Sequence, residues 1–341
     1  MRKSRIRVLM VMLSVIAILS FAFCTADLTA AEKTKIIKLS HPLPDFDIMV
    51  QGIMKAAEEF NAIAGGRYKI EVYPGGVLAG MLEGFEMVQS GALEACDFAP
   101  DYLSEKDLIF GAQNLPFAFK DGLSFQKFLD AVREQEWDQR LKDKYNVKLL
   151  SLLVCFAHDA WCGTKPIKTL EDWKGKVVWA SSPAEAESLK LLGASPVSMD
   201  WGEGYPAIEK GVVDGGTYGL GAAWMLKWSA CKYFTAANMF SSSAGVVINQ
   251  DVFNSMPKDL QDALLKVFNS YQEKMIPYFT HDVLKIMEDE LKASGAEVYH
   301  PPADEIARWA EATKGAWDSY LGKLPPEKAK MIKSLIEEAN K

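Results

Sequence analysis

The chain has 341 residues, of which 49% are hydrophobic and 24% charged, with a formal net charge of −7 at pH 7. This acidic balance argues against a nucleic-acid partner, because contacts to phosphates need clustered Lys and Arg side chains. The chain is too long for one simple core, so two domains are expected.

The first 31 residues have the pattern of a secretory signal peptide. A basic head at residues 2–7 precedes an apolar run at 8–23, and small residues at 29–31 offer a cleavage site. A membrane anchor is the alternative, because the run is about as long as the shortest membrane-spanning helices. No second run reaches that length, so we expect a periplasmic mature chain that does not span the membrane. Cleavage removes four basic residues and one acid, which takes the net charge from −7 to −10.

Strands alternate with helices in the first part of the mature chain. Period-two patterns and short apolar runs predict the strands, and apolar residues at helical spacing predict the helices between them. The expected strands are 36–40, 68–73 and 93–98. Asp45 or Asp47 can cap the first helix, and Gly65 can end it. This order predicts a largely parallel sheet with helices on both faces.

A strand is expected at 147–154, after a mixed stretch at 104–145. A second α/β run follows, with expected elements strand 176–180, helix 183–192, strand 195–199, helix 203–210 and strand 211–215. Ser182 is expected to cap the helix after it, with Pro183 at the first helical position and Glu185 completing a capping box. Trp179 lies at the end of the preceding strand, where ligands bind in open α/β folds.

Two stretches of the chain echo each other. "FEMVQSGALEA" at 85–95 aligns with "YPAIEKGVVDG" at 205–215. In both, a helix ends on Gly and a short strand follows, with an acidic residue (Glu94 or Asp214) at the third position. This repetition favours two similar lobes.

The last third of the chain is mostly helical. A long segment from Met256 to Ser294 contains Pro277, where a kink is expected. A long helix after two α/β lobes can brace both of them. Two further helices are expected, from Glu305 and from Pro326.

Motifs for catalysis and metal binding are missing. The sequence has no G-x-S-x-G elbow, phosphate-binding loop or H-E-x-x-H, and its four histidines are not spaced with carboxylates or cysteines as metal ligands are. No catalytic residue, metal or cofactor is therefore expected. A secreted hydrolase would need a nucleophile and a base in contact, and only Cys155 and His158 hint at such a pair. A two-lobed protein without catalytic groups is typical of a receptor that closes over a small molecule.

Four cysteines remain after cleavage: Cys96, Cys155, Cys162 and Cys231. An oxidising compartment permits disulfides. Cys155 and Cys162 are close enough in sequence for a hairpin bridge, and buried thiols are the alternative. The spacings are not those of a zinc site.

Several stretches resemble the solute-binding proteins of tripartite ATP-independent periplasmic (TRAP) transporters. They are "SHPLP" (40–44), "GGVLAGMLEGFEMVQSGALE" (75–94), "NLPFAF" (114–119), "TKPIKTLEDWKGKVV" (164–178), "LGASPVSMDWGEGYPAIEKGVVDGG" (192–216) and "VVINQDVFNSMPKDLQ" (246–261). They occur in order and span nearly the whole mature chain. The resemblance implies a two-lobed α/β periplasmic binding protein fold with a long kinked C-terminal helix bracing both lobes. Lobe I would comprise 32–155 and 244–283, and lobe II 156–243 and 284–341.

The resemblance also implies a function. The protein would be an extracytoplasmic receptor that captures a small organic anion, a carboxylate or a sulfonate. It would deliver this ligand to the permease subunits of a TRAP uptake system driven by an ion gradient. A periplasmic sensor that binds the same ligand and signals to a membrane receptor is the alternative.

The sequence departs from the family where the ligand's carboxylate is usually bound. An arginine is usual there, because a guanidinium donates two parallel hydrogen bonds to a carboxylate. Its place falls on Trp179, the place of a family asparagine falls on Tyr218, and a second, less constant arginine falls on His158. The mature chain has four arginines, and none lies at a predicted crevice position.

The candidate ligand contacts are His41, Asp97, Tyr102, His158, Trp161, Trp179 and Tyr218, with Phe117 as a further candidate. An aromatic-lined cleft can stack an aromatic acid, or enclose a small anion held by His158, Ser or backbone N–H groups. It can also hold a quaternary ammonium through cation–π contacts. The neighbouring aromatics Trp201, Trp224, Trp228 and Phe240 are expected to pack in the core.

Overall fold

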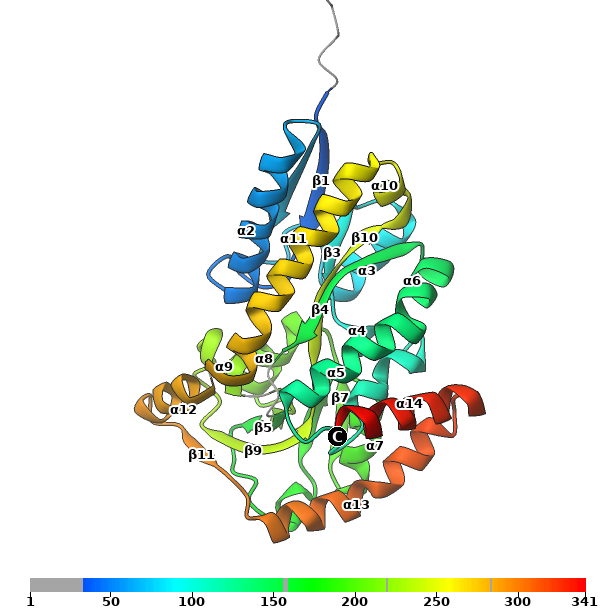
Figure 1. The fold of residues 1–341 in the computed structure, drawn as a ribbon. Coiled ribbons are helices and arrows are strands. Elements are labelled where there is room, and N and C mark those ends of the chain that lie inside the picture. The colour runs from blue at the N-terminus through cyan, green and yellow to red at the C-terminus, as the bar shows by residue number, and fades with distance from the viewer. Residues whose placement is uncertain (1–32, 156–158, 219, 283) are drawn as a thin grey trace, which may run out of the picture.

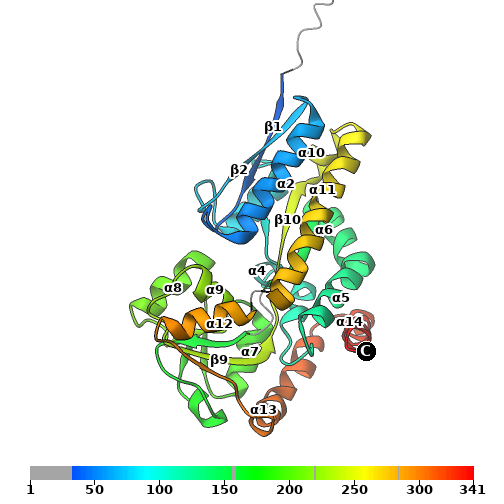
Figure 2. The same ribbon diagram turned by 60° about the vertical axis from the view of Figure 1, so that its left-hand side comes forward.

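The computed structural model describes residues 33–155, 159–218, 220–282 and 284–341. They form two α/β lobes, each built around its own sheet, which Figures 1 and 2 show from two directions. The predicted signal peptide and His158 lie outside the described residues. In the described part of the chain, no helix is both long and apolar enough to cross a membrane.

The sheet of lobe I has five strands in the order β2-β1-β3-β10-β4. Their bounds are β1 Lys35–Ser40, β2 Tyr68–Tyr73, β3 Ala95–Phe98, β4 Val147–Val154 and β10 Ser243–Asn249. Strand β1 pairs in parallel with β2 and β3, whereas β10 runs antiparallel to β3 and β4. The carboxyl ends of β1, β3 and β4 and the start of β10 therefore meet at one edge of the sheet.

Helices cover this sheet and connect its strands. They are α2 Ile48–Ala64, α3 Met81–Ser90, α4 Pro100–Leu103, α5 Gly122–Val132, α6 Asp138–Tyr145 and α10 Gln250–Asn254. Of the two candidate caps, Asp47 is the one used, since its carboxylate accepts the N–H groups of Met49 and Val50. Gly65, in the left-handed conformation, ends α2 as predicted.

The sheet of lobe II has six strands in the order β11-β9-β5-β8-β6-β7. Their bounds are β5 Asp159–Gly163, β6 Val177–Ala180, β7 Ser195–Ser198, β8 Gly215–Gly216, β9 Tyr233–Phe240 and β11 Glu297–Tyr299, and the helices are α7 Pro183–Leu191, α8 Trp201–Glu209 and α9 Leu220–Met225. The expected strand at 211–215 is reduced to two residues. The reason is that the N–H groups of Val212 and Val213 bond back to Ala207 at the end of α8.

The start of α7 differs from its prediction in one respect. Ser182 does cap the helix, accepting the Glu185 N–H at 3.3 Å. However, the Glu185 carboxylate accepts from the Ser181 N–H (2.9 Å) and the Thr217 hydroxyl (2.8 Å), so the reciprocal half of the capping box is not formed. Glu185 is buried, and this burial raises the pKa of its carboxyl.

The C-terminal helices contact both lobes. Helix α11 (Lys258–Pro277) packs on α2 and β4, a π-helical turn (Tyr278–Asp282) follows Pro277, and α12 (Leu284–Ala293) packs on α9 and β11. Helix α13 (Ala303–Leu321) packs on α7 of lobe II, and α14 (Pro326–Ala339) packs on α5 of lobe I. The break after Pro277 and the bracing of both lobes agree with the predicted fold. The predicted lobe boundaries at 155, 243 and 283 remain predictions.

Candidate ligand-binding site

A small cavity of about 60 Å³ lies where the two lobes meet. Lobe I contributes the segments at the carboxyl ends of β1 and β3 and at the start of β10, and lobe II contributes the start of α8, Tyr218 and α9. The lining residues are Leu43, Met49, Met81, Asp97, Ala99, Asp101, Tyr102, Ser242, Ser243 and Ala244 from the lobe I side, and Trp201, Tyr218, Ala222, Met225 and Leu226 from the lobe II side.

One hydrogen bond crosses the cavity wall from lobe to lobe. The hydroxyls of Tyr102, on α4, and Tyr218, after β8, lie 2.8 Å apart. Burial raises the pKa of both phenols well above the usual value, so both hydroxyls keep their protons. The bond fixes the two rings as neighbouring parts of one wall.

Asp101 lines the cavity and is held by neutral donors. Its carboxylate accepts the Ser242 hydroxyl at 3.0 Å and the side-chain amide of Gln113, whose own carbonyl accepts the Ser243 hydroxyl at 2.6 Å. No cation joins this network among the described residues. Burial raises the pKa of Asp101 to about 7, and the negative charge of Glu185 adds to the shift.

Asp97 faces the cavity from the end of β3, with His41 beside it. The His41 Nδ1 accepts the Leu43 N–H at 3.1 Å, so the neutral ring carries its proton on Nε2. That nitrogen lies 3.3 Å from the Asp97 Oδ1. His41 itself is 1% exposed and does not line the cavity, so it packs behind Asp97.

Trp179 lies directly behind the lobe II wall. It is fully buried, its ring centroid is 4.2 Å from that of Tyr218 and 5.6 Å from that of Trp201, and its Nε1 donates to the Met199 carbonyl at 3.3 Å. Trp179 is not among the residues that line the cavity. The ring therefore supports Tyr218 and Trp201, which do line it.

The remaining candidates lie elsewhere. Trp161 is buried in β5, packs on Trp173 and donates to the Lys165 carbonyl at 2.8 Å. Phe117 has a positive φ of 53° and lies near helices α13 and α14, and its N–H donates to the carbonyl of Met239 on β9 at 2.7 Å. His158 lies outside the described residues. The cavity thus brings together Asp97, Tyr102 and Tyr218 of the predicted contacts.

Asp101 and Trp201 are cavity residues that the sequence analysis missed. Asp101 lies one position before the predicted Tyr102, so the rule that ligands bind after strand ends already pointed to its segment. Trp201 was expected only in the core, and it has a double role because it packs on Trp179 and also lines the cavity. Helix α9, with Met225, joins the lobe I residues in one wall only because the two lobes meet there, which no local pattern in the sequence predicts.

The cavity wall has a distinctive charge pattern. It contains two carboxylates, Asp97 and Asp101, together with three aromatic rings and three methionines. None of the described lining residues is Lys or Arg. The arginine that is usual in the family, whose place falls on Trp179, has no counterpart among the described residues of this wall.

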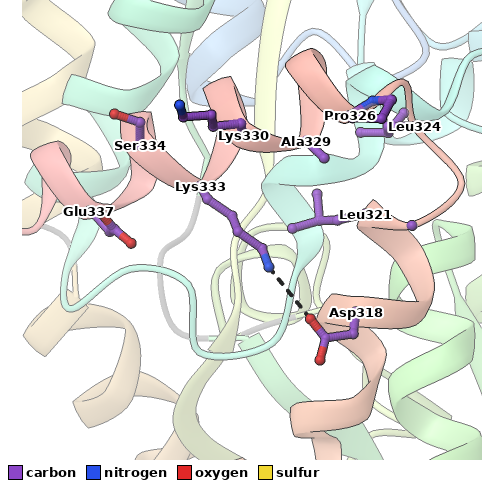
Figure 3. Close-up of a pocket in the computed structure, with 10 residues that line it drawn as sticks. Asp318, Leu321, Leu324, Pro326, Ala329, Lys330, Lys333, Ser334 and Glu337 are labelled. Carbon is purple, nitrogen blue, oxygen red and sulfur yellow. Dashed lines mark hydrogen bonds and ion pairs between the residues drawn. The ribbon is translucent and has the colours of Figure 1, made fainter.

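A larger, open hollow of about 700 Å³ lies away from the lobe junction, between α13 and α14. Figure 3 shows Lys333 of α14 reaching towards Asp318 of α13, a 3.5 Å ion pair across the hollow. Its lining is formed by the two C-terminal helices and the turn between them. All of its lining residues lie within 318–337, so no strand end of either sheet contributes to it, and it is not the site that lobe closure would enclose.

A family model described as "bacterial extracellular solute-binding protein, family 7" matches residues 39–323. The chain belongs to this family. It is 25% identical over 252 residues to the 2,3-diketo-L-gulonate-binding periplasmic protein of Escherichia coli, covering 71% of this chain and 75% of that one. It is also 25% identical over 315 residues to the C4-dicarboxylate-binding periplasmic protein of Rhodobacter capsulatus, covering 89% and 91%.

Solved structures of the family share the fold. A TRAP periplasmic solute-binding protein of Haemophilus influenzae, with bound L-gulonate, superposes with a TM-score of 0.81 at 24% identity, covering 90% of this chain and all of that one. The resemblance to TRAP solute-binding proteins and the two-lobed α/β fold are therefore confirmed. Family 7 proteins are solute-binding receptors rather than enzymes. The described residues hold no cluster of His, Cys, Asp and Glu suited to a metal ion.

Proposed function

We propose that the protein is a periplasmic receptor, exported by a cleaved signal peptide at residues 1–31, that delivers a small organic acid to a TRAP permease. The relatives support this ligand class: one binds 2,3-diketo-L-gulonate, another C4-dicarboxylates, and a solved neighbour holds L-gulonate. The acid group is a carboxylate or a sulfonate. Capture requires closure of the two lobes over the ligand, and the closed form is the one that the permease recognises.

The observation that carries this proposal is the cavity walled by both lobes. A site formed from two lobes binds tightly only when they close, because each lobe supplies half of the contacts. The proposed direct contacts are Asp97, Tyr102 and Tyr218, together with Asp101 and Trp201. Trp179 and His41 act from behind, by holding Tyr218 and Asp97 in place. The other two sequence candidates, Trp161 and His158, have no assigned part in this arrangement.

A second candidate ligand is a solute with an ammonium group, such as a quaternary ammonium. The wall carries Asp97 and Asp101, and the ring of Trp201 lines the same cavity. Carboxylates and aromatic faces both attract a cation in a dry cavity. An anion would instead meet two acidic groups without a Lys or Arg among the described lining residues.

Binding can be tested on the mature protein purified from the periplasm. A thermal-shift screen would cover carboxylates, sulfonates, aromatic acids, betaines and quaternary ammonium compounds. We expect a member of one class to raise the Tm by several degrees, because a ligand that binds only the folded state stabilises it. The receptor proposal fails if no class produces a shift.

The pH dependence of affinity then separates the two ligand classes. Because the pKa of Asp101 is about 7, its carboxyl is mostly protonated at pH 6 and mostly ionised at pH 8. An anion prefers the neutral form, so calorimetry should show about threefold to tenfold tighter binding at pH 6. An ammonium compound prefers the ionised form and should bind more tightly at pH 8.

A gene deletion distinguishes delivery of the ligand from sensing. If the protein delivers the ligand, deleting its gene should abolish uptake even though the permease is intact.

A further inference from the structure

Two cysteines from distant parts of the sequence meet inside lobe II. Cys162 lies on β5, and Cys231 lies in the turn between α9 and β9, 69 residues later. Their Sγ atoms are 2.8 Å apart, and the two side chains are only 0% and 3% exposed. Both belong to the apolar cluster that contains Trp179 and Tyr218.

We propose that Cys162 and Cys231 form a disulfide bond in the exported protein. The backbone on either side already holds them together, because β5 pairs with β9 and Cys162 lies opposite Phe234. The Lys232 N–H, next to Cys231, donates to the Gly163 carbonyl, next to Cys162, at 3.0 Å. An S–S bond of about 2.05 Å therefore needs the two sulfur atoms to approach by less than about 1 Å.

The inference rests on the proposed export, because disulfides form in oxidising compartments. The oxidant is the disulfide of a thiol oxidoreductase or of a small molecule. One cysteine thiolate attacks that disulfide, forming a mixed disulfide and releasing one sulfur of the oxidant as a thiol. The second cysteine thiolate attacks the cysteine sulfur of the mixed disulfide, which forms the Cys162–Cys231 bond and releases the second sulfur of the oxidant as a thiol. Two protons and two electrons leave the cysteine pair, and the oxidant is reduced to two thiols. Both sulfur atoms are buried in the folded lobe, so the reaction belongs to the folding stage, before the cluster closes.

The bond would join two segments that carry the lobe II side of the cavity. Cys231 follows α9 and the adjacent Leu226, which line the cavity. Cys162 pairs with Gly216 of β8, two residues before Tyr218. A covalent link between them fixes the wall of the ligand site, besides stabilising lobe II.

The other two cysteines occupy lobe I. Cys96 is buried in β3, and the Cys155 Sγ contacts the Met49 Sδ of α2 at 3.8 Å. The hairpin bridge between Cys155 and Cys162, left open by the sequence, is therefore the competing arrangement to exclude. Proximity in space favours Cys231 as the partner of Cys162.

Peptide mapping tests the pairing directly. The full chain would be expressed with its own signal peptide, collected from the periplasm, and alkylated in denaturant without a reductant. Trypsin leaves Cys155 and Cys162 together in the peptide 149–168 and Cys231 in 228–232. A second cleavage before Asp159 separates the first two. We expect a linked pair of 159–168 with 228–232, which a reductant splits. Unlinked peptides, or a link through Cys155, would overturn the proposal.

Stability gives an independent readout. A reductant, or the double substitution Cys162→Ala with Cys231→Ala, should lower the Tm by about 5–10 °C, because the bond closes a long loop. In that double variant the reductant should cause no further change, whereas the control Cys155→Ala should respond to it as the wild type does. An equal response of the double variant and the wild type would contradict the bond.

The two proposals fail separately. If the cysteines are unlinked in a protein that still binds its ligand, the disulfide proposal is wrong and the receptor proposal stands. If the disulfide is found but the protein binds none of the screened compounds, the receptor proposal is wrong and the disulfide proposal stands. If the double variant does not fold, the peptide map of the wild type still decides.

Discussion

Asp101 is a buried acid whose protonation depends on the cavity around it. The unfolded chain releases this proton near pH 3.9, whereas the folded protein holds it up to about pH 7. Between these values the folded state binds more protons than the unfolded state, so the contribution of Asp101 to stability is lost as the pH rises. Above pH 7 the folded protein bears the full cost of a buried carboxylate.

The substitution Asp101→Asn removes this titration. At each pH, the free energy of unfolding of the variant is compared with that of the wild type. We expect this difference to favour the variant by about 1–4 kcal/mol more at pH 8 than at pH 5. Urea denaturation at the two pH values measures it. The control is Asp304→Asn on the exposed side of α13, for which the two values should agree. A pH-independent difference for Asp101→Asn would show that burial does not perturb this carboxyl.

The predicted contacts that line the cavity and those that do not differ in what determines their place. Asp97 and Tyr102 follow the end of a strand, which is a local feature that the sequence reveals. Trp179 also stands at a strand end, but its ring turns inward because Tyr218 and Trp201 cover it. Packing between elements decides whether an aromatic ring lines the cavity or lies behind its wall. A local sequence pattern does not predict this packing.

At the level of elements, the similarity between segments 85–95 and 205–215 reflects the same type of connection between parallel strands. The Glu94 carboxylate accepts the Lys38 N–H of β1 at 3.0 Å, one position before β3 pairs with β1. The Asp214 carboxylate accepts the Val177 N–H of β6 at 2.9 Å, one position before β8 pairs with β6. The short motif therefore does predict equivalent parallel connections. The strands β5, β9 and β11 carry no such local signal, because their pairing is set by segments far along the chain.

Helix α8 can pack on Trp179 only because Gly204 has no side chain. A Cβ atom at Gly204 would lie 2.1 Å from the Trp179 ring. Gly204→Ala must therefore displace α8 or the ring, and we expect a loss of about 1–3 kcal/mol in the free energy of unfolding. Because Tyr218 and Trp201 rest on that ring, ligand affinity should fall as well. Chemical denaturation and calorimetry measure the two effects.

A second helical glycine provides the matched control. At Gly315 in α13 an added Cβ would lie 3.7 Å from Leu191, an ordinary contact. Gly315→Ala should stabilise the protein by about 0.5–1 kcal/mol, because Ala favours the helix interior over Gly. Ligand affinity should stay unchanged there. If both alanine variants behaved alike, the contact between α8 and Trp179 would not be tight.

At the level of the whole molecule, function depends on the balance between separated and closed lobes. Besides the Tyr102–Tyr218 bond, the Ser198 hydroxyl of β7 donates to Glu105 at 2.6 Å, from lobe II to lobe I. Contacts on the side of the connecting strands, such as Asn238 to the Phe119 carbonyl, also join the halves. The Tyr102–Tyr218 and Ser198–Glu105 bonds need the two lobes in contact, so they contribute to closure and not to the stability of either lobe.

Tyr102→Phe tests this separation of roles. It removes one bond of closure and leaves the buried Tyr218 hydroxyl without this partner, which should cost about 1 kcal/mol in the closed form. Affinity for the compound found by the screen should then fall about fivefold, since binding is coupled to closure. The Tm without ligand should change little. Small-angle scattering should show less compaction at subsaturating ligand.

Tyr73→Phe is the control, because its hydroxyl bonds to Glu71 within lobe I. Equal affinities of the two variants would mean that closure does not depend on the bond between the tyrosines.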